Sequence, residues 1–289
     1  MKLGFIGFGE VGFEISMGLK QEGVSGIIAY DVMHDHPSYS ALLKERADKA
    51  AVSLQNSAKQ VIDQSDVIIV AVPGAKALET AIGIKEFLND QKLYVDVSAS
   101  APSVKKELWA NIEGSGALFV DGAMLGSLPV YKHKVPTLIS GSGAAKFYEM
   151  FKPLGMDLEQ VSAVPGDATG IKFVRSIFMK GLPALLVEVI EAADTMKVDH
   201  LVLPSIYKTM AACSFEDTVN RLVTGSSVHA ERRAHEMKDV ISMLESIGVE
   251  PTMSKASYER LSWLASKNLK EKFAGRTPKQ WKEVVEAWK

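Results

Sequence analysis

The chain has 289 residues, of which 47% are hydrophobic and 24% charged, and its formal net charge is −2. This length exceeds that of one small domain and suits two domains, each with its own core. The near-neutral charge gives no general attraction to nucleic acid or to an anionic membrane, so we expect neither as a partner. The longest apolar runs are much shorter than the roughly 20 residues that span a bilayer, so we expect no membrane-spanning segment.

The start of the chain, "MKLGFIGFGEVG", has apolar residues like those of a signal peptide. Glycines and Glu10 interrupt the run, and no small-residue cleavage site follows, so we interpret it as a strand. Cys213 is the only cysteine, which excludes an intrachain disulfide and a thiolate metal cluster. Both features predict a protein of the reducing cytoplasm.

Short apolar stretches alternate with helical patterns over residues 1–165, which is typical of a parallel sheet covered by helices. The predicted strands cover residues 2–7, 25–31, 66–73, 92–98, 117–125, 135–142 and 157–162. The predicted helices between them cover residues 10–22, 38–48, 76–88 and 102–112. The pattern predicts an α/β domain of the Rossmann type, with a doubly wound parallel sheet.

Strand signals vanish after this region, and residues 166–289 predict an all-helical second domain. The predicted helices cover residues 168–196, 226–247 and 254–272, and a short last helix begins at Thr277 with Pro278 in its first position. The helix over 168–196 is apolar nearly all round after Lys180. We therefore expect it to be buried, as the core of the second domain and against a partner chain in a homodimer.

The segment "FIGFGEVG" places Gly7, Gly9 and Gly12 in the GxGxxG spacing, where the first strand turns into a helix. Such glycines permit a tight turn, close approach of a pyrophosphate to backbone N–H groups, and close packing of helix on strand. A glycine-rich turn without a ligand has the same spacing, so the motif needs support from other residues. The predicted dinucleotide loop also includes Phe8, Glu10 and Val11.

Asp31 supplies that support, because it ends the second strand about 20 residues after the glycines, where an acid holds the ribose hydroxyls of NAD. A carboxylate there would repel a 2′-phosphate, and no arginine follows in "DVMHDHPSY", so NAD is favoured over NADP. Val72 and Pro73 end a later strand and are candidates to wall the cofactor. His34 and His36 are expected in a solvated loop, and we predict no metal site.

Two serines mark a candidate substrate site. Ser98 and Ser100 follow another predicted strand and precede Pro102 and a helical run. Their hydroxyls and the free N–H groups at that helix start are a plausible anion cradle. Helix capping alone explains Ser100 well and Ser98 less well.

A second candidate lies in "GIKFVRSIFMKG", where Lys172, Arg175 and Lys180 recur with no acidic residue between Asp167 and Glu188. On a helix these cations lie along one side, and we expect the first of them, Lys172, to face a cleft between the domains. Ser176 follows Lys172 by one turn and can share a substrate with it, and Arg175 is a candidate clamp for a carboxylate or phosphate. The alternative is a lysine that snorkels from a boundary helix.

The segments "GFIGFGEVG", "DVSASAP", "FVDGAMLGS", "GDATGIKFVRS" and "MKDVISMLESIG" together carry a resemblance. Through them the chain resembles, over nearly its whole length, the β-hydroxyacid dehydrogenases, the group of 3-hydroxyisobutyrate and 6-phosphogluconate dehydrogenases. The resemblance implies a Rossmann domain followed by a helical domain, and cofactor glycines at Gly7, Gly9 and Gly12. It further implies a substrate-binding serine at Ser98, a catalytic lysine at Lys172, and a lysine near the nicotinamide at Lys238.

The chain departs from that family at two places. Ser176 stands where the family has an asparagine, and Leu125, Gly126 and Ser127 stand where it has a Ser-Gly-Gly turn for the substrate carboxylate. Gly126 and Ser127 remain our candidates for the substrate turn. The departures are similar to those of a divergent branch whose helical domain has no assigned function.

The resemblance implies an NAD(P)-dependent oxidoreductase that transfers a hydride between nicotinamide and a small, anionic 3-hydroxy acid or a related alcohol or carbonyl. Lys172 would act as general acid or base. Two alternatives stay open. One is an imine reductase on the same scaffold, a group that usually lacks the lysine, and the other is a protein that binds a dinucleotide without catalysis.

Overall fold

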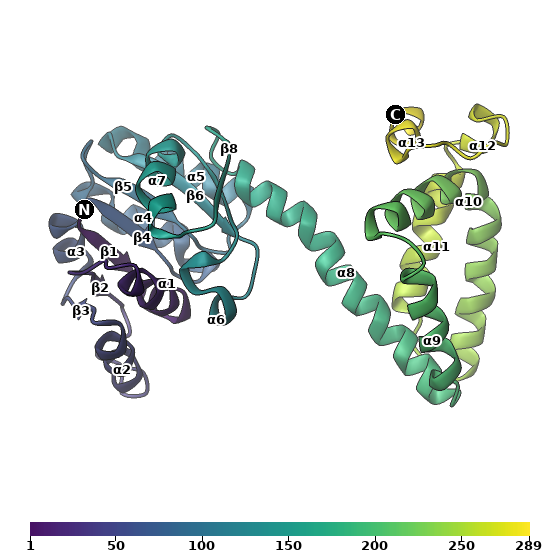
Figure 1. Cartoon of the computed structure of the whole chain (residues 1–289), viewed down its shortest axis with the longest axis horizontal. Helices are drawn as coiled ribbons and strands as arrows, with labels where there is room; N and C mark the ends of the chain where they lie inside the picture. The colour runs from purple at the N-terminus through teal and green to yellow at the C-terminus, as the bar shows by residue number, and fades with distance from the viewer. The chain divides into compact units, whose positions relative to one another are not determined.

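The computed structural model describes residues 1–289, and the chain forms two compact units, Met1–Ile177 (unit 1) and Phe178–Lys289 (unit 2) (Figure 1). Unit 1 holds one eight-stranded, mostly parallel sheet with flanking helices, and unit 2 is helical. The predicted fold class is therefore confirmed. The predicted division into domains at residues 165 and 166 stays a prediction.

The sheet has the strand order β3-β2-β1-β4-β5-β6-β7-β8, and every neighbouring pair is parallel except β6 with β7. The carboxyl ends of β1, β4, β5 and β6 consequently lie at one edge, where open α/β sheets bind ligands. The strands are β1 (Leu3–Ile6), β2 (Ile28–Tyr30), β3 (Ser53–Leu54), β4 (Val67–Val70), β5 (Leu93–Asp96), β6 (Leu118–Met124), β7 (Thr137–Ser140) and β8 (Leu158–Ser162).

Seven helices of unit 1 connect or flank these strands: α1 (Glu10–Gln21), α2 (Ser40–Ala50), α3 (Ala58–Gln64), α4 (Ala77–Ile84), α5 (Pro102–Ile112), α6 (Leu128–Tyr131) and α7 (Ala144–Phe151). The elements β3, α3, α6 and α7 were not among those expected from the sequence. They are short, so hydrophobic periodicity has few positions in which to appear.

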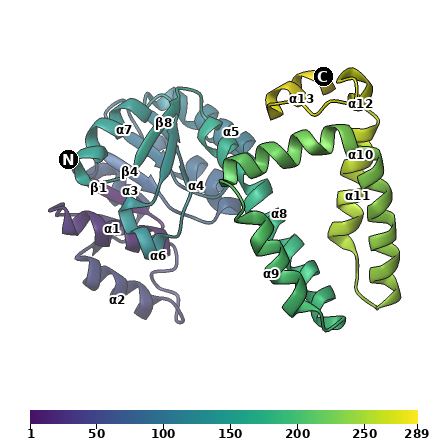
Figure 2. The same cartoon turned by 45° about the vertical axis from the view of Figure 1, so that its right-hand side comes forward.

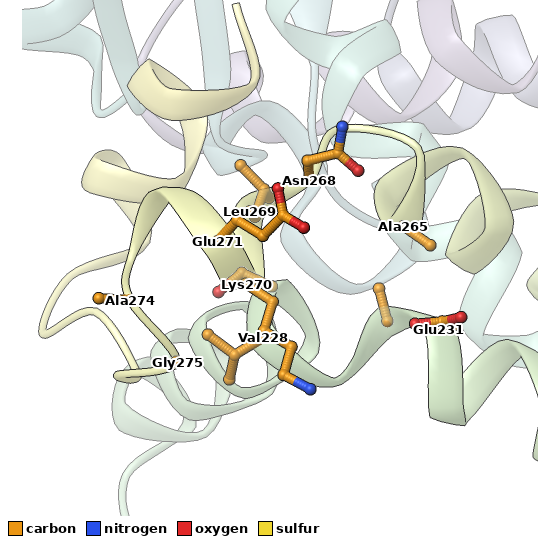
Figure 3. A pocket seen from close by; sticks show the side chains of 11 residues that line it. Val228, Glu231, Ala265, Asn268, Leu269, Lys270, Glu271, Ala274 and Gly275 are labelled. Atoms are coloured by element: carbon orange, nitrogen blue, oxygen red, sulfur yellow. The ribbon is translucent and has the colours of Figure 1, made fainter.

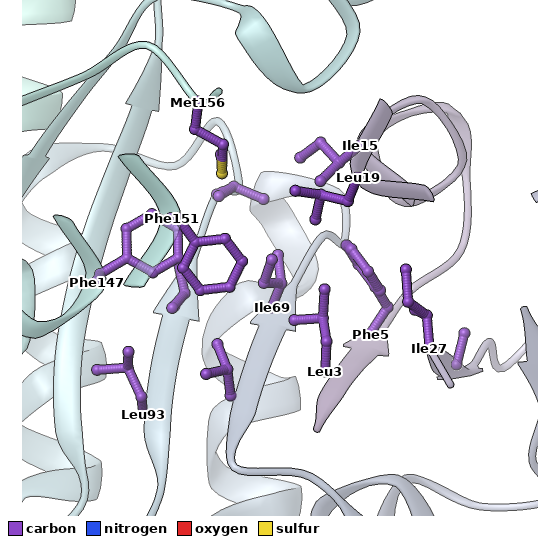
Figure 4. Close-up of a cluster of buried hydrophobic side chains, with 14 of the residues drawn as sticks. Leu3, Phe5, Ile15, Leu19, Ile27, Ile69, Leu93, Phe147, Phe151 and Met156 are labelled. Atoms are coloured by element: carbon purple, nitrogen blue, oxygen red, sulfur yellow. The ribbon is translucent and has the colours of Figure 1, made fainter. Parts of the chain in front are cut away.

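Alternate side chains of each strand point to opposite faces of the sheet, which gives unit 1 two cores. On one face, Phe5 and Ile69 pack with residues of α1 and α7, including the stacked rings of Phe147 and Phe151 (Figure 4). On the other face, side chains such as Tyr94 pack with residues of α3, α4 and α5. Both faces are apolar because helices cover both, as in other doubly wound sheets.

Unit 2 contains the C-terminal part of α8 (Asp167–Thr195), then α9 (Asp199–Met210), α10 (Phe215–Ser246), α11 (Thr252–Ala265), α12 (Leu269–Lys272) and α13 (Trp281–Trp288). The long helices α10 and α11 lie side by side in both views (Figures 1 and 2). A small buried cluster of Ala230, Leu264, Leu269 and Val284 joins α10 to the last three helices. No helix of the chain is both long enough and apolar enough to cross a membrane.

A buried carboxylate ties α8 to α11 within unit 2. Glu188 is 7% exposed, and its carboxylate accepts hydrogen bonds from the backbone N of Met253 and from the backbone N and Oγ of Ser254, at 2.5, 2.9 and 2.6 Å. These N–H groups belong to the first turn of α11, and the N–H groups of a first turn have no acceptors inside their own helix. The carboxylate therefore caps α11 and also complements its dipole.

Two predicted helix starts in unit 2 are wrong. The helix predicted from residue 226 begins at Phe215, where Ser214 caps it by accepting from the Asp217 backbone N. The last helix begins at Trp281 rather than at Thr277, because Gln280 and Glu283 form a capping box there. In both cases a side-chain cap, rather than the apolar pattern, sets the first residue.

The expected burial of α8 as the core of unit 2 is wrong for the single chain. Between residues 178 and 195 only Glu188 and Ala193 are buried, whereas Val187 is 65% exposed and Ile190 is 49% exposed. An apolar helix sequence predicts that the helix surface is buried, but it does not show whether the same chain or another chain buries it.

Helix α1 contacts the turn Lys132–Lys134 at a point where only glycine fits. A Cβ atom on Gly18 would lie 1.9 Å from Nδ1 of His133, which is 2% exposed. Burial holds the pKa of His133 below its ordinary value, and the nearby Glu22, with Oε1 3.4 Å from Nε2, opposes that shift only in part. The imidazole is thus held neutral in a tight contact with α1.

We expect Gly18→Ala to lower the free energy of unfolding by about 1–3 kcal/mol, because the new methyl group overpacks the contact with His133. Gly83→Ala is the matched control, since Gly83 is exposed in α4 and a Cβ there meets no atom within 4 Å. The control should stabilise the protein by roughly 0.4–1 kcal/mol through the unfolded chain. Urea unfolding measures both. Equal effects of the two substitutions would show that the Gly18 contact is not tight.

Candidate functional site

The three glycines of the loop after β1 have different roles. Gly7 has a φ of +87°, and a Cβ on it would lie 2.5 Å from the Ala71 carbonyl oxygen. A Cβ on Gly12 would lie 3.0 Å from the Gly7 carbonyl oxygen. Gly7 and Gly12 are therefore required by the protein's own packing, whereas a Cβ on Gly9 would meet nothing within 4 Å.

The open space at Gly9 lies directly before α1, whose first residue is Glu10. The first N–H groups of a helix have no partners inside it, and the helix dipole favours negative charge there. A dinucleotide pyrophosphate fits such a loop. Phe8 is fully buried, whereas Glu10 is exposed and Val11 is half-buried.

Asp31 lies beside this loop, as its position in the sequence predicts. Its Oδ2 accepts from the Phe8 backbone N at 2.7 Å, and its Oδ1 accepts from the Met33 backbone N at 2.9 Å. The carboxylate is half-exposed and keeps free lone pairs that can accept from hydroxyl groups. The hydrogen bond to Phe8 fixes it against the glycine loop.

Val72 adjoins the same loop on its other side. Its Cγ1 atom would lie 3.0 Å from a Cβ placed on Gly7, and Pro73 follows it as an exposed residue. The structure thus brings together the glycine loop, Asp31 and Val72. All three lie at the carboxyl ends of β1, β2 and β4.

Ser98 and Ser100 are both buried at the end of β5. Ser98 Oγ donates to Asp96 Oδ1 at 2.6 Å, Ser98 N donates to the same oxygen at 3.1 Å, and the two serine hydroxyl oxygens are 3.0 Å apart. A hydroxyl carries a single proton, and that of Ser98 goes to the carboxylate. Ser98 therefore offers a lone pair to a ligand, which suits a hydroxyl donor better than a bare carboxylate.

A buried ion cluster that sequence reasoning missed lies behind Ser98. Lys105 of α5 has a side chain that is 0% exposed, and its Nζ is 2.5 Å from Asp96 Oδ1 and 3.3 Å from Asp121 Oδ1. The sequence carries a signal for it, because the strands contain "YVD" at 94–96 and "FVD" at 119–121. Two such tripeptides on neighbouring parallel strands place two acids side by side, which calls for a buried cation.

Tyr94 belongs to the same face of β5, two residues before Asp96. Its hydroxyl is buried without a hydrogen-bond partner, and burial, together with the negative charge of Asp96, raises the pKa of Tyr94 well above its ordinary value. Tyr94 therefore stays neutral and supplies no proton chemistry. It packs on Phe119, with ring centroids 5.8 Å apart.

Lys172 lies on α8, three residues after Thr169 and half-buried. Ser176, one turn later, donates its hydroxyl proton to the Lys172 carbonyl oxygen at 2.9 Å, so only its lone pairs remain for a ligand. Arg175 lines an open cavity of about 700 Å³ with Lys106, Val161 and other residues that do not include Lys172. Lys172 and Arg175 therefore do not line this cavity together.

The remaining predicted residues are placed as follows. Gly126 and Ser127 are exposed and connect β6 to α6. Lys238 lies on α10, where its Nζ is 5.3 Å from the centroid of the Tyr258 ring. Its place beside a nicotinamide stays a prediction.

Unit 2 has a further cavity of about 390 Å³, shown in Figure 3. Residues of α10 such as Val228 line it, together with the segment around α12 that contains Leu269 and Lys270. None of the predicted site residues borders it. This cavity is therefore not part of the predicted site.

Comparison with known proteins identifies both parts of the chain. The model for the NAD binding domain of 6-phosphogluconate dehydrogenase matches residues 2–163, and a domain of unknown function, DUF1932, matches residues 188–264. An uncharacterized 28.5 kDa protein of Methanothermus fervidus is 28% identical over 89% of this chain and 96% of its own length.

Two further proteins are similar to the chain. Mouse mitochondrial 3-hydroxyisobutyrate dehydrogenase is 29% identical over 56% of this chain and 48% of its own length, so the match spans about half of that enzyme. An imine reductase of Myxococcus stipitatus, solved with NADP+, aligns with a TM-score of 0.74 over 100% of both chains at 16% identity, which shows a shared fold.

Proposed function

The chain belongs to the family of the NAD binding domain of 6-phosphogluconate dehydrogenase, and from this premise we propose an NAD-dependent oxidoreductase. The proposed substrate is a small 3-hydroxy acid or a related alcohol or carbonyl compound. The resemblance predicted from the sequence is confirmed, and the helical region carries the domain of unknown function that a divergent branch implies. The observation that carries the proposal is the glycine loop held against Asp31 and left open at Gly9.

The cofactor would lie on the backbone of the glycine loop, with its ribose hydroxyls on Asp31 and one wall at Val72. Bound NAD supplies the hydride acceptor. Asp31 supports NAD over NADP because a carboxylate repels a 2′-phosphate, and residues 31–39 contain no lysine or arginine to attract one.

Lys172 is proposed as the general acid or base. As the carbinol carbon is oxidised, its hydroxyl proton passes to Nζ of Lys172, and in the reverse direction Nζ returns it to the carbonyl oxygen. Ser98 is proposed to accept a hydrogen bond from a substrate hydroxyl, since its own proton is committed to Asp96. Ser100, Gly126, Ser127, Arg175 and Ser176 are proposed as further substrate contacts, and Lys238 as a cofactor contact.

The test is a screen of hydroxy acids, sugar acids and their aldehydes for formation or consumption of NADH. We expect turnover of at least one 3-hydroxy acid or its carbonyl product. The full-length alignment with an imine reductase motivates adding cyclic imines to the screen as a second candidate function. Turnover of imines alone would replace the proposed substrate class, and NADH binding without any turnover would indicate a non-catalytic dinucleotide-binding protein.

We expect Asp31→Ser to weaken NAD binding and to relax discrimination against NADP. The substitution removes a charge-assisted hydrogen bond to ribose, worth about 1.5–3 kcal/mol, together with the repulsion of phosphate. The control is Asp35→Ser, because the Asp35 side chain is 89% exposed and carries the same charge in the same loop. Fluorescence titration with NADH and NADPH measures both. An unchanged preference in the Asp31 variant would remove Asp31 from the cofactor site.

We expect Lys172→Ala to lower kcat by about 10²- to 10⁴-fold, the contribution of a general acid or base. NADH affinity and the unfolding midpoint should stay unchanged. Lys172→Arg should not restore turnover, because a guanidinium does not give up its proton near neutral pH. Lys146→Ala, at an exposed lysine of α7, is the control. Near-normal kcat in Lys172→Arg would reduce Lys172 to an electrostatic role.

We propose that a second copy of the chain covers α8 and that the protein is a homodimer. Residues Ile177, Met179 and Val187 are 75%, 47% and 65% exposed in the single chain, and an apolar surface of this kind marks an interface. Light scattering should give twice 31.4 kDa at micromolar concentration. Val187→Asp should shift the mass toward one chain, and Ala256→Asp, at an exposed position of α11, should not. A single-chain mass for the native protein would contradict the homodimer.

A further inference from the structure

The repeated tripeptides "YVD" and "FVD" lie in register on neighbouring parallel strands. Tyr94 pairs with Phe119, and Asp96 pairs with Asp121. Strands in a sheet are about 4.8 Å apart, so two carboxylates on the same face lie close together. Both side chains are 0% exposed, which makes their mutual repulsion large unless cations or hydrogen-bond donors offset it.

The two carboxylates are satisfied in different ways. Asp121 has four donors: Lys105 Nζ, Thr169 Oγ1, the Thr169 backbone N and Ser140 Oγ. The Thr169 N–H belongs to the first turn of α8, so Asp121 is also a helix cap. Asp96 has Lys105 and the two Ser98 groups on Oδ1, while its Oδ2 is buried without a hydrogen-bond partner.

Lys105 is the element that both carboxylates share. It lies on α5 and donates to the backbone oxygen of Asp96 at 3.0 Å as well as to Asp96 Oδ1 at 2.5 Å. Lys105 contacts Asp96, which holds the Ser98 loop, and it also contacts Asp121, which caps the first turn of α8. We propose that Lys105 is a positioning residue that joins the loop carrying Ser98 to the turn preceding Lys172, through Asp96 and Asp121.

The proposal rests on the proposed function in that Ser98 and Lys172 are the groups to be aligned. Thr169 precedes Lys172 by three residues, which is less than one helical turn, so the Asp121 cap fixes the start of the helix that presents the lysine. Ser98 is fixed by Asp96 through both its N–H and its hydroxyl. Ser98 and Lys172, which are proposed to bind the same substrate, are thus both linked to the buried ammonium of Lys105, one through Asp96 and the other through Asp121.

A purely stabilising role explains the cluster less well. Buried ion triads can often be replaced by apolar side chains with no loss of stability, because desolvation offsets the Coulomb attraction. The donors to the Asp96 carboxylate, from Ser98 and Lys105, all lie on Oδ1. Each carboxylate also binds a segment of the predicted site: Asp96 binds Ser98, and Asp121 binds the first turn of the helix that carries Lys172.

Hydrogen exchange of backbone amides tests the linkage without any substrate. Asp96→Asn removes one charge beside Lys105 at a residue that makes no hydrogen bond to Thr169. We expect exchange of the Thr169 amide to accelerate by about tenfold, the effect typical of residues that share one network. In a Lys105→Met background, Asp96→Asn should have no further effect at Thr169.

Glu107→Gln is the matched control, because Glu107 is an exposed residue of the helix that carries Lys105 and its substitution also removes one carboxylate charge. It should leave the amides of Ser98 and Thr169 unchanged. Acceleration at Ser98 alone in Asp96→Asn would overturn the proposal, as would equal effects of that substitution with and without Lys105. If Lys105→Met does not fold, the Thr169 amide in Asp96→Asn alone decides between the two outcomes.

A kinetic readout follows once a substrate is known. Lys105→Met should lower kcat by about tenfold or more while leaving NADH affinity unchanged, since it misaligns groups without touching the cofactor. Absence of turnover in the native protein would count against the proposed function only, because the exchange experiment needs none. Coupled exchange would then still support the linkage.

Discussion

The charge balance of two buried carboxylates is the constraint on which the candidate site depends. In-register pairing of β5 and β6 places Asp96 beside Asp121 away from water, where an unpaired carboxylate is costly to bury. Lys105 and the first turn of α8 supply the compensation. The register of β5 and β6 thus creates an electrostatic requirement, and the start of α8 and the Ser98 loop both take part in meeting it.

The same device recurs in unit 2, where Glu188 caps α11 as Asp121 caps α8. A buried carboxylate at a helix start satisfies donors that the helix leaves unpaired, and the helix dipole in turn lowers the cost of burying the charge. Each unit thus fixes one helix through a single side chain. Helix α8 receives such a cap in unit 1 and supplies one in unit 2, while most of its apolar surface between residues 178 and 195 stays uncovered in the single chain.

The glycines of the dinucleotide loop differ in what surrounds them. Gly7 and Gly12 are required by backbone conformation and close packing, and would be glycine in an unliganded turn of this shape. Gly9 has no neighbour to exclude a side chain, so the protein's own packing does not account for a glycine there, and the open space suits the close approach of a ligand. This distinction is independent of the sequence pattern, and it agrees with the family match over residues 2–163.

The sequence by itself determined the alternation of strands and helices, the glycine loop with Asp31, and the helical character of unit 2, because these depend on local periodicity and on short spacings. Short elements such as α3 and α7, and helix starts set by Ser214 and Gln280, lay beyond that signal. Only the tertiary structure decided that Lys105 is buried between Asp96 and Asp121, since their contact needs strands β5 and β6 in register and α5 packed on that face. A lysine in an amphipathic helix is exposed by default, and burial becomes favourable only when two acids distant in sequence meet beneath it.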